Sequence, residues 1–511
     1  MPSPIRLFSV VTIAVAGFIT SQLTLLDAVA DVTLPNIFCD HMILQRDQAN
    51  KLWGKSSAAE SISATIAGQT VTTQANADGV WSLMLPSLEA GGPHSLVVRA
   101  SNEIKINDVL VGEVWICSGQ SNMQWKVGAA NDADLEQLAS DYPQIRMINF
   151  PQIGSQTPVW SHDAARWQVC SSETVKDFSA VGYFFARQVH QTIGVPVGMI
   201  NNAWGGSACE AWVDLPTLSK TGRYQGLLDT WAVRNNEYAK LSSIQSPTDE
   251  EKVKLGNIKK LASGNHNPSN IYNGVLASHI GYGIKGAIWY QGESNASRAY
   301  QYRELFPLMI TTWRSRWNQG DFPFYWVQLA DFKGENDEPN ESEWAELREA
   351  QSMTMKTVPK TGQAVIIDIG EGKDIHPRNK VDVGRRLARW ALANEYGVEI
   401  AFRSPEFKSM AIFEGKATLQ FDYLGSGWRP FDTAEPKGFA IAGDDRKFVW
   451  ANATVGKDNS VQVSSALVPN PVAVRYAWAD NPRCNMYSQS GLPLTPFRTD
   501  EWPGLTVDRN E

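Results

Sequence analysis

The feature that most constrains this fold is the alternation of short apolar runs with helix-like segments between residues 109 and 397. The apolar runs cover residues 114–117, 197–200, 286–290, 324–329 and 365–368, and helical periodicity marks residues 179–193, 300–317, 343–357 and 381–396. Such alternation predicts a mostly parallel α/β sheet with right-handed connections, because parallel strands need a crossover between them. A polar, charged, helix-prone insertion at about 216–268 interrupts it, either as a solvated excursion or as a lid.

Strand-like segments flank this α/β region on both sides. Residues 31–107 contain short alternating strands separated by Gly and Asp turn signals, a pattern typical of a small β-sandwich. Strands and turns return after residue 397. We therefore predict a β-sandwich-like domain at 31–107, an α/β domain at 108–397 and a β-rich C-terminal region at 398–511.

The first 30 residues predict a signal peptide. Arg6 supplies a positive charge, residues 7–19 form an apolar run, and Ala28-Val29-Ala30 fits an A-x-A cleavage site. Polar residues at 20–24 interrupt the run before it reaches the roughly 20 residues that span a bilayer, which argues against a membrane anchor. We expect cleavage after Ala30 and a secreted or periplasmic protein that makes no membrane contact.

Charge and cysteine content exclude several functions. The 511 residues include 46 Lys and Arg against 54 Asp and Glu, a net charge of −8, so no broad basic face for nucleic acid is expected. The five cysteines are too scattered for a disulfide framework, and no Cys or His spacing is typical of zinc. Their pairing and the oligomeric state stay open.

Polar motifs follow four of the predicted strands, where ligands of open parallel sheets bind. These motifs are Gly119-Gln120-Ser121-Asn122-Met123, Asn202-Ala203-Trp204-Gly205-Gly206-Ser207, Gln291-Gly292-Glu293-Ser294-Asn295 and Asp374-Ile375-His376. They contain a hydroxyl nucleophile, side-chain amides, small residues with accessible backbone amides, and an acid beside an imidazole. Acyl transfer needs these groups, because a serine hydroxyl requires a base and the tetrahedral oxyanion requires preorganised donors.

Ser121 is the predicted nucleophile and His376 the predicted base. An isolated Ser at a strand-to-helix turn is otherwise an ordinary helix N-cap, and a loop His is often a surface residue. The chain order Ser121, Asp374, His376 favours catalysis, with Asp374 as the acid that orients the imidazole. Asp368 or a backbone carbonyl could replace Asp374 in that role.

Other residues of the motifs are candidates for oxyanion stabilisation and substrate binding. A backbone amide at Gly206 and a side-chain amide of Gln291 or Asn295 would suit the oxyanion, although each is also common in plain turns and loops. Arg298 or Arg378 would pair with a sugar carboxylate, or with a surface acid. The residues expected to contact substrate are Gln120, Trp204, Glu293 and Arg298, where Glu293 could instead brace its loop and Trp204 could be core.

The four motifs together resemble the sialate O-acetylesterase family, a branch of the SGNH (GDSL-like) hydrolases. Further similarity at residues 40–45, 270–274, 474–482 and 491–500 extends the resemblance over nearly the whole mature chain. The resemblance implies a flavodoxin-like SGNH hydrolase core between β-rich regions, with no metal and no cofactor.

The resemblance also implies a reaction in which acetyl groups leave sugar hydroxyls through an acetyl-Ser intermediate. Ser121 would attack, His376 would pass its proton to the sugar oxygen, and the amides of Ser121 and Gly206 would hold the oxyanion with a side chain from residues 291–295. The sequence departs from the broader SGNH pattern in that third block, and only one residue separates Asp374 from His376. The partner would be an acetylated carbohydrate, either O-acetylated sialic acid or a polysaccharide such as xylan.

Three other functions are compatible with such a core. A non-catalytic carbohydrate-binding protein is disfavoured because every motif is intact. A lipase or thioesterase needs an apolar acyl channel, whereas the motifs have polar, Trp-rich surroundings. A glycosidase needs two carboxylates at a fixed separation, and the sequence does not show that Glu293 and Asp374 lie at that separation.

Overall fold

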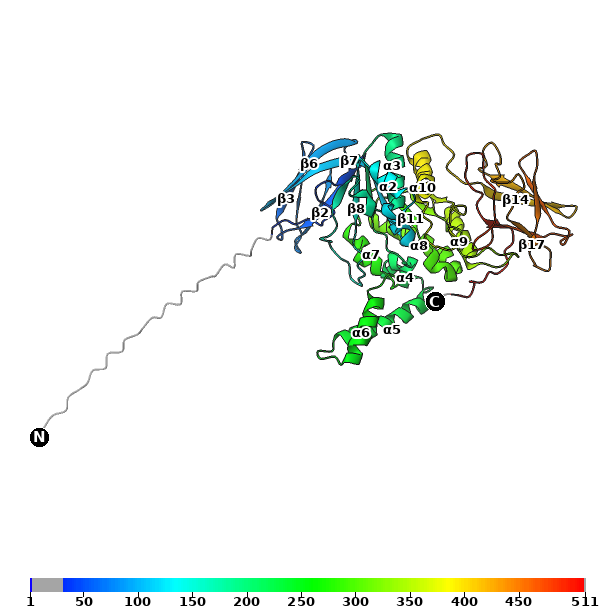
Figure 1. Cartoon of the computed structure of the whole chain (residues 1–511). Helices are drawn as coiled ribbons and strands as arrows, with labels where there is room; N and C mark the ends of the chain where they lie inside the picture. Colours follow the sequence, from blue (N-terminus) through cyan, green and yellow to red (C-terminus); the bar gives the residue numbers. More distant parts are fainter. Residues whose placement is uncertain (2–30, 510–511) are drawn as a thin grey trace.

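A mostly parallel sheet lies at the centre of the molecule (Figure 1). This computed structural model describes residues 1 and 31–509, so the predicted signal peptide and its cleavage site lie outside the described residues. All neighbouring strands run parallel except the last pair. Their order is β13 (Thr361–Ala364), β12 (Phe324–Val327), β11 (Gly286–Tyr290), β7 (Glu103–Gly119), β10 (Val197–Asn201), β8 (Tyr142–Asn149) and β9 (Trp167–Cys170).

Two pairs of long helices cover the two faces of this sheet. Neighbouring residues of a strand point to opposite faces, so Ile288 of β11 packs with the first pair of helices and Trp289 with the second. The first pair is α3 (Ala180–Ile193) and α10 (Lys380–Glu395), and the second is α8 (Ala299–Trp317) and α9 (Glu343–Thr357). The predicted α/β architecture with a largely parallel sheet is confirmed.

The predicted strand at residues 365–368 is wrong, because β13 ends at Ala364. Ile366 is buried with the helices α3 and α10, whereas Val365 and Ile367 are buried in the core of the C-terminal region. This apolar run therefore connects two hydrophobic cores and does not extend the sheet.

The N-terminal β region shares the long strand β7 with the central sheet. The first half of β7 pairs with β1 (Ile43–Gln45) and β6 (Gly91–Arg99), and β3 (Ser61–Ile66) joins β6 to β4 (Gln69–Gln74). A separate hairpin consists of β2 (Asn50–Lys55) and β5 (Val80–Leu85). The predicted division after residue 107 thus falls within a continuous 17-residue strand.

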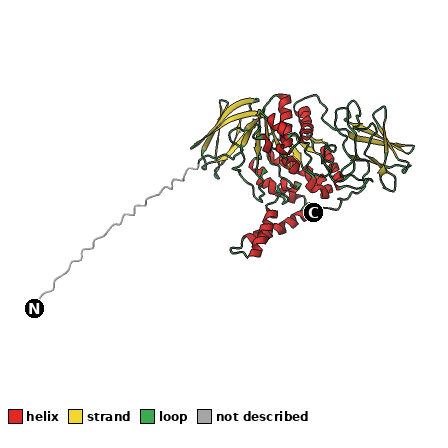
Figure 2. Cartoon of the chain, in the orientation of Figure 1, coloured by secondary structure: helices red, strands yellow, loops and turns green. Residues whose placement is uncertain are grey.

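The C-terminal region consists of two four-stranded antiparallel sheets (Figure 2). Buried side chains from both sheets, such as Leu419 and Val474, form one core between them. The first sheet contains β14 (Glu406–Phe413), β15 (Lys416–Asp422), β19 (Val461–Ser464) and β18 (Asn452–Val455), and the second β17 (Val449–Trp450), β16 (Phe439–Ala442), β20 (Ala473–Tyr476) and β21 (Phe497–Arg498).

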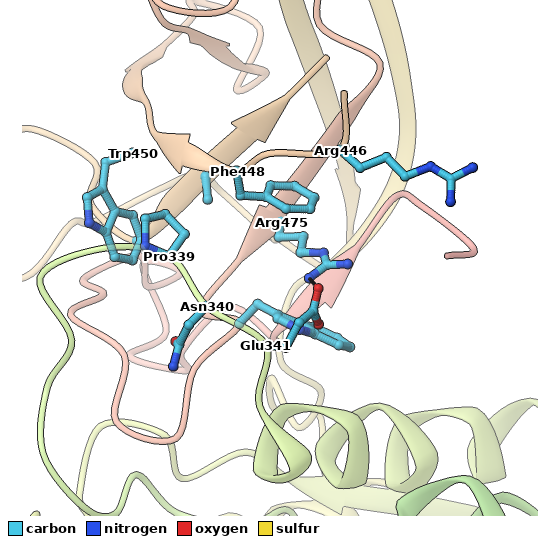
Figure 3. Close-up of a pocket in the computed structure, with 10 residues that line it drawn as sticks. Pro339, Asn340, Glu341, Arg446, Phe448, Trp450 and Arg475 are labelled. Atoms are coloured by element: carbon cyan, nitrogen blue, oxygen red, sulfur yellow. Dashed lines mark hydrogen bonds and ion pairs between the residues drawn. The ribbon is translucent and has the colours of Figure 1, made fainter. Parts of the chain in front are cut away.

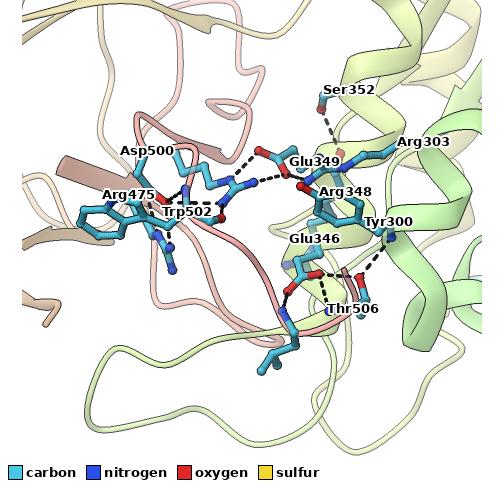
Figure 4. Close-up of polar contacts among 12 residues, drawn as sticks. Tyr300, Arg303, Glu346, Arg348, Glu349, Ser352, Arg475, Asp500, Trp502 and Thr506 are labelled. Carbon is cyan, nitrogen blue, oxygen red and sulfur yellow. Dashed lines mark hydrogen bonds and ion pairs between the residues drawn. The ribbon is translucent and has the colours of Figure 1, made fainter. Parts of the chain in front are cut away.

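Buried and half-buried arginines attach this region to the helix α9 (Figure 4). The guanidinium of Arg348 in α9 donates to the carbonyl oxygens of Leu329, Ala330, Ala479 and Asp480. Beside it, Arg498 of β21 pairs with Glu349 at 2.7 Å, and Glu349 also pairs with Arg303 at 2.6 Å. The C-terminal region is therefore fixed to the α/β region through polar contacts.

The insertion forms a helical arm that projects from the body of the molecule (Figure 1). Its helices are α4 (Leu215–Lys220), α5 (Gln225–Ser242) and α6 (Asp249–Ala262), as the polar composition predicts. Thr248 and Glu251 form a capping box that starts α6. The chain re-enters the body at Asn265 and continues into α7 (Asn270–Gly274).

No helix in the described part of the chain is long and apolar enough to cross a membrane. The five cysteines all lie in that part, and each is a free thiol: Cys39, Cys117, Cys170, Cys209 and Cys484.

Candidate active site

The strand β7 delivers Ser121 to the carboxyl edge of the sheet. Gly119 ends β7 opposite Tyr290, and a Cβ on Gly119 would lie 2.2 Å from the Tyr290 carbonyl oxygen. Gly119 also has a φ of 131°, which side chains rarely allow. This glycine lets β7 and β11 end side by side, and Ser121 then begins the short helix α1 (Ser121–Gln124).

Ser121 and His376 form a hydrogen-bonded pair. The distance between Ser121 Oγ and His376 Nε2 is 2.8 Å, although 255 residues separate them in the chain. The loop between β13 and α10 carries His376, and the Trp125 ring stacks on the imidazole with a centroid distance of 5.2 Å and an interplanar angle of 18°. In this geometry the imidazole can accept the hydroxyl proton.

Asp374 is the acid beside this imidazole. Its Oδ1 accepts a hydrogen bond from the His376 backbone N–H at 2.9 Å and lies 3.4 Å from His376 Nδ1. The latter distance is long for a hydrogen bond. The competing acid Asp368 is engaged elsewhere, in a bidentate pair with Arg386 at 2.6 Å for both contacts.

The loop with Gly205 and Gly206 lies against Ser121. A Cβ on Gly205 would be 3.5 Å from Ser121 Cβ, and the Gly205 N–H donates to Gln124 Oε1 at 2.7 Å. Asn265, where the helical arm re-enters, donates to the Gly205 carbonyl at 2.5 Å. Among the described residues, the N–H groups of Ser121 and Gly206 have no acceptor, so both are available to an oxyanion.

The side chains of Gln291 and Asn295 are committed to protein partners. Gln291 Nε2 donates to the Ser207 carbonyl at 3.1 Å and to Asn295 Oδ1 at 2.7 Å. Asn295 Nδ2 donates to Glu210 Oε2 at 3.0 Å, and both amides are buried. We expected one of these amides to contact the oxyanion. In the structure both instead form hydrogen bonds within the protein that hold their loop in place.

Two of the expected substrate contacts are internal. Gln120 is buried, and its Oε1 accepts from the backbone N–H groups of Gly292 and Ser294 at 3.2 and 3.4 Å. Arg298 is buried and pairs with Glu210 at 2.6 Å. Burial opposes ionisation of Glu210, but the Arg298 charge together with hydrogen bonds from Arg298 and Asn295 lowers the pKa of that carboxyl. Trp204 is partly buried against the core.

Glu293 belongs to a buried polar network beneath the Ser–His pair. Asn122 Nδ2 donates to Glu293 Oε1 at 2.8 Å and to the Ile375 carbonyl at 2.9 Å, and Lys380 Nζ donates to Asn122 Oδ1 at 2.5 Å. Asn122, the residue after the proposed nucleophile, is thus hydrogen-bonded to Ile375, the residue before His376. Burial raises the pKa of Glu293, and burial lowers the pKa of Lys380 to about 7.

Sequence reasoning missed Lys380 and the role of Asn122. Asn122 stands inside the first motif, so its position was a usable signal, but Lys380 is a single Lys at the start of a helix. Within residues 31–509, no group of three or more His, Cys, Asp or Glu side chains is placed to hold a metal ion.

Comparisons with known proteins agree on one kind of enzyme. A family model described as carbohydrate esterase, sialic acid-specific acetylesterase, matches residues 111–245 and 258–393. A carbohydrate acetylesterase from Xanthomonas citri, known from its crystal structure, is 39% identical with a TM-score of 0.81, covering 92% of this chain and 100% of that chain. Sialate O-acetylesterases of Homo sapiens and Mus musculus are each 27% identical over 91% and 90% of this chain and 92% of their own length.

The central sheet, the groups gathered at its carboxyl edge and these relatives define a carbohydrate esterase. More specifically, the chain belongs to the sialic acid-specific acetylesterase family, which confirms the resemblance of its motifs. The residues between the two matched segments, 246–257, lie in the helical arm.

Proposed function

We propose that this protein is an exported serine esterase that removes O-acetyl groups from carbohydrates through an acetyl-Ser121 intermediate. The observation that carries the proposal is the 2.8 Å contact between Ser121 Oγ and His376 Nε2. Export follows from the predicted signal peptide. The chemistry needs no group beyond this chain's residues, the ester and water.

In the first half of the reaction, Ser121 Oγ attacks the acetyl carbonyl carbon while His376 Nε2 takes the hydroxyl proton. The N–H groups of Ser121 and Gly206 stabilise the negative oxygen of the tetrahedral intermediate. Collapse breaks the bond between the carbonyl carbon and the sugar oxygen, which receives the proton from His376. In the second half, water attacks the acetyl-Ser in the same way and releases acetate.

We also propose that the α/β region is a flavodoxin-like SGNH hydrolase core. Apart from β8 and β9, which extend the sheet beyond β10, the strands β7, β10, β11, β12 and β13 lie in the order 2-1-3-4-5 when numbered along the chain, as in flavodoxin-like sheets. The order reverses between β7 and β11, and Ser121 and Glu293 follow these two strands. This is where doubly wound sheets bind their ligands.

The acetylated sugar is either O-acetylated sialic acid or a unit of a polysaccharide such as xylan. The names of the relatives include both a sialate and a general carbohydrate acetylesterase. Arg298 was a candidate to bind a sialic acid carboxylate, but in the structure it pairs with Glu210 instead.

Acetate release by the mature protein tests this function. The substrates are O-acetylated sialic acid, acetylated xylo-oligosaccharide and a simple aryl acetate, each with the native protein and with Ser121→Ala. We expect the native protein to release acetate from the aryl acetate and from at least one acetylated sugar. Ser121→Ala should lose this activity. The control Ser219→Ala, whose serine is exposed on α4, should retain it. No acetate release from any of the three substrates, or full activity of Ser121→Ala, would refute the proposal.

A further inference from the structure

Three adjoining cavities follow the seam between residues 331–341 and the C-terminal region, and we call them the seam groove. Their volumes are about 430, 240 and 140 Å³. The first and second share Lys437 and Arg483, and the second and third share Gly438 and Trp450. The three cavities therefore adjoin one another along the seam, and Figure 3 shows the third.

The seam groove begins at the loop that carries His376. Asp331 and Asp368 line its first cavity, and Asp331 Oδ1 accepts from the Gly370 N–H at 2.7 Å. A Cβ on Gly372 would lie 2.8 Å from Asn481 Nδ2, so this loop also touches the C-terminal region at the groove wall. The loop that carries His376 thus contacts residues of the groove wall.

Aromatic rings line each of the three cavities. Phe431, 69% exposed, stands in the first cavity with Tyr487, and their ring centroids are 6.0 Å apart. Trp450, 39% exposed, borders the second and third cavities, and Phe448 lines the third (Figure 3). The Trp450 indole donates to the Asp337 carbonyl at 2.6 Å, which fixes the ring orientation. Amphipathic rings of this kind offer flat surfaces for sugar rings.

The charges of the groove do not favour a polyanion. Arg483 pairs with Glu335 at 2.5 Å and Arg475 with Glu341 at 2.8 Å. Among the described lining residues that form no ion pair, Lys437 and Arg446 face three carboxylates, those of Asp331, Asp432 and Glu435, so the groove has no excess of positive charge. Burial raises the pKa of Asp331.

We propose that the seam groove binds an uncharged glycan chain whose acetylated unit reaches Ser121, so that the substrate is a neutral acetylated polysaccharide or oligosaccharide. This inference rests on the proposed esterase function and assigns its substrate class. Aromatic rings in each cavity offer surfaces for sugar units, and the absence of excess positive charge suits a neutral chain better than sialylated glycans.

Kinetics of groove variants test the proposal on two substrates. The variants are Trp450→Ala and Phe431→Ala, with Phe413→Ala as a control because Phe413 is 73% exposed on β14 and does not line the groove. On acetylated xylo-oligosaccharide, each groove variant should raise KM roughly three- to tenfold by losing one ring contact. On the aryl acetate, kcat/KM should stay unchanged, and the control should match the native protein on both. Equal losses on both substrates, or no loss on either, would overturn the proposal.

Binding without turnover separates this proposal from the esterase function. Calorimetric titration of Ser121→Ala uses unacetylated xylo-oligosaccharide and a sialylated oligosaccharide as probes. We expect the neutral probe to bind and the added Trp450→Ala change to weaken it. Failure of the neutral probe to bind, or stronger Trp450-dependent binding of the sialylated probe, would overturn the proposal even if acetate is released. A protein that binds the neutral probe but hydrolyses no ester would instead refute the esterase function.

Discussion

Asp374 supports His376 through a long contact, and 39% of its side chain is exposed. Solvent competes for such a contact, so its contribution to catalysis should be smaller than that of the imidazole itself. We predict that Asp374→Asn lowers kcat on an aryl acetate about tenfold, whereas His376→Ala lowers it by roughly 10² to 10⁴, the range of general acid–base catalysis. Steady-state kinetics of both variants would show this order, and equal losses would contradict it.

Lys380 should make stability depend on pH above neutrality. Its pKa is about 7 in the folded protein, against 10.5 for an ordinary Lys. Between these values the unfolded chain binds more protons, so the free energy of unfolding rises with pH. We predict that Lys380→Met loses this part of the rise, and urea unfolding at a series of pH values would measure it. An unchanged slope in the variant would contradict a buried, neutral Lys380.

Glu293 should act in the opposite direction at lower pH. Burial raises its pKa above the ordinary 4.5, so the folded protein keeps a proton that the unfolded chain has released. The free energy of unfolding therefore falls as the pH rises above 4.5. Glu293→Gln should remove this decrease of the free energy of unfolding in the same urea experiment. If the decrease in the variant is as large as in the native protein, groups other than Glu293 cause it.

The proposed catalytic groups were predictable because short motifs contain them. Ser121 and Gly206 follow strands that the pattern predicts, His376 follows the apolar run just beyond β13, and the edge of a parallel sheet brings such positions together. The fates of Gln291 and Arg298 were not predictable, because an amide and a guanidinium serve equally well in a ligand site or an internal bond. Only the tertiary positions of Ser207 and Glu210 decide between these uses.

At the scale of elements, the junction of β7 and β11 depends on Gly119. A Cβ there would lie 2.2 Å from a backbone oxygen that cannot move without displacing β11. We predict that Gly119→Ala lowers the free energy of unfolding by about 3 kcal/mol or more. Urea unfolding measures this, with Gly320→Ala as the control.

Gly320 also has a positive φ, 69°, but a Cβ there meets nothing within 4 Å. Its substitution should cost only about 1–2 kcal/mol, the strain of a left-handed residue. Equal effects at the two glycines would contradict the close approach of the strands.

Most of the predicted helices and strands are confirmed, although β8 and β9 were not predicted, and the one wrong strand is instructive. The run Val365-Ile366-Ile367 is apolar enough for a strand, but its side chains belong to two different cores. Local pattern predicts that these residues are buried, and it does not say which neighbouring layer buries them.

At the scale of the whole molecule, Arg348 holds the C-terminal region to α9. It is fully buried and donates to the carbonyls of residues 329, 330, 479 and 480. We predict that Arg348→Met lowers the free energy of unfolding by about 3 kcal/mol or more, because it leaves buried carbonyls unsatisfied. Limited proteolysis should then cleave the C-terminal region earlier than in the native protein.

The control is Arg385→Met, whose side chain on α10 is 55% exposed and pairs with Asp382 at 3.9 Å. An exposed pair of this kind contributes little, so a change within about 0.5 kcal/mol is expected. Unaltered stability and proteolysis in Arg348→Met would show that other contacts attach the region.

The central claim is that Ser121 carries the acetyl group between sugar and water. Rapid acid quenching of the native protein with an aryl acetate, followed by mass mapping of its peptides, tests this claim most directly. We predict that the acetyl group appears on the peptide containing Ser121 during the first turnovers, and that Ser121→Ala neither acquires it nor releases acetate. An acetyl group on a different residue that forms at the turnover rate, or undiminished acetate release by Ser121→Ala, would contradict the account.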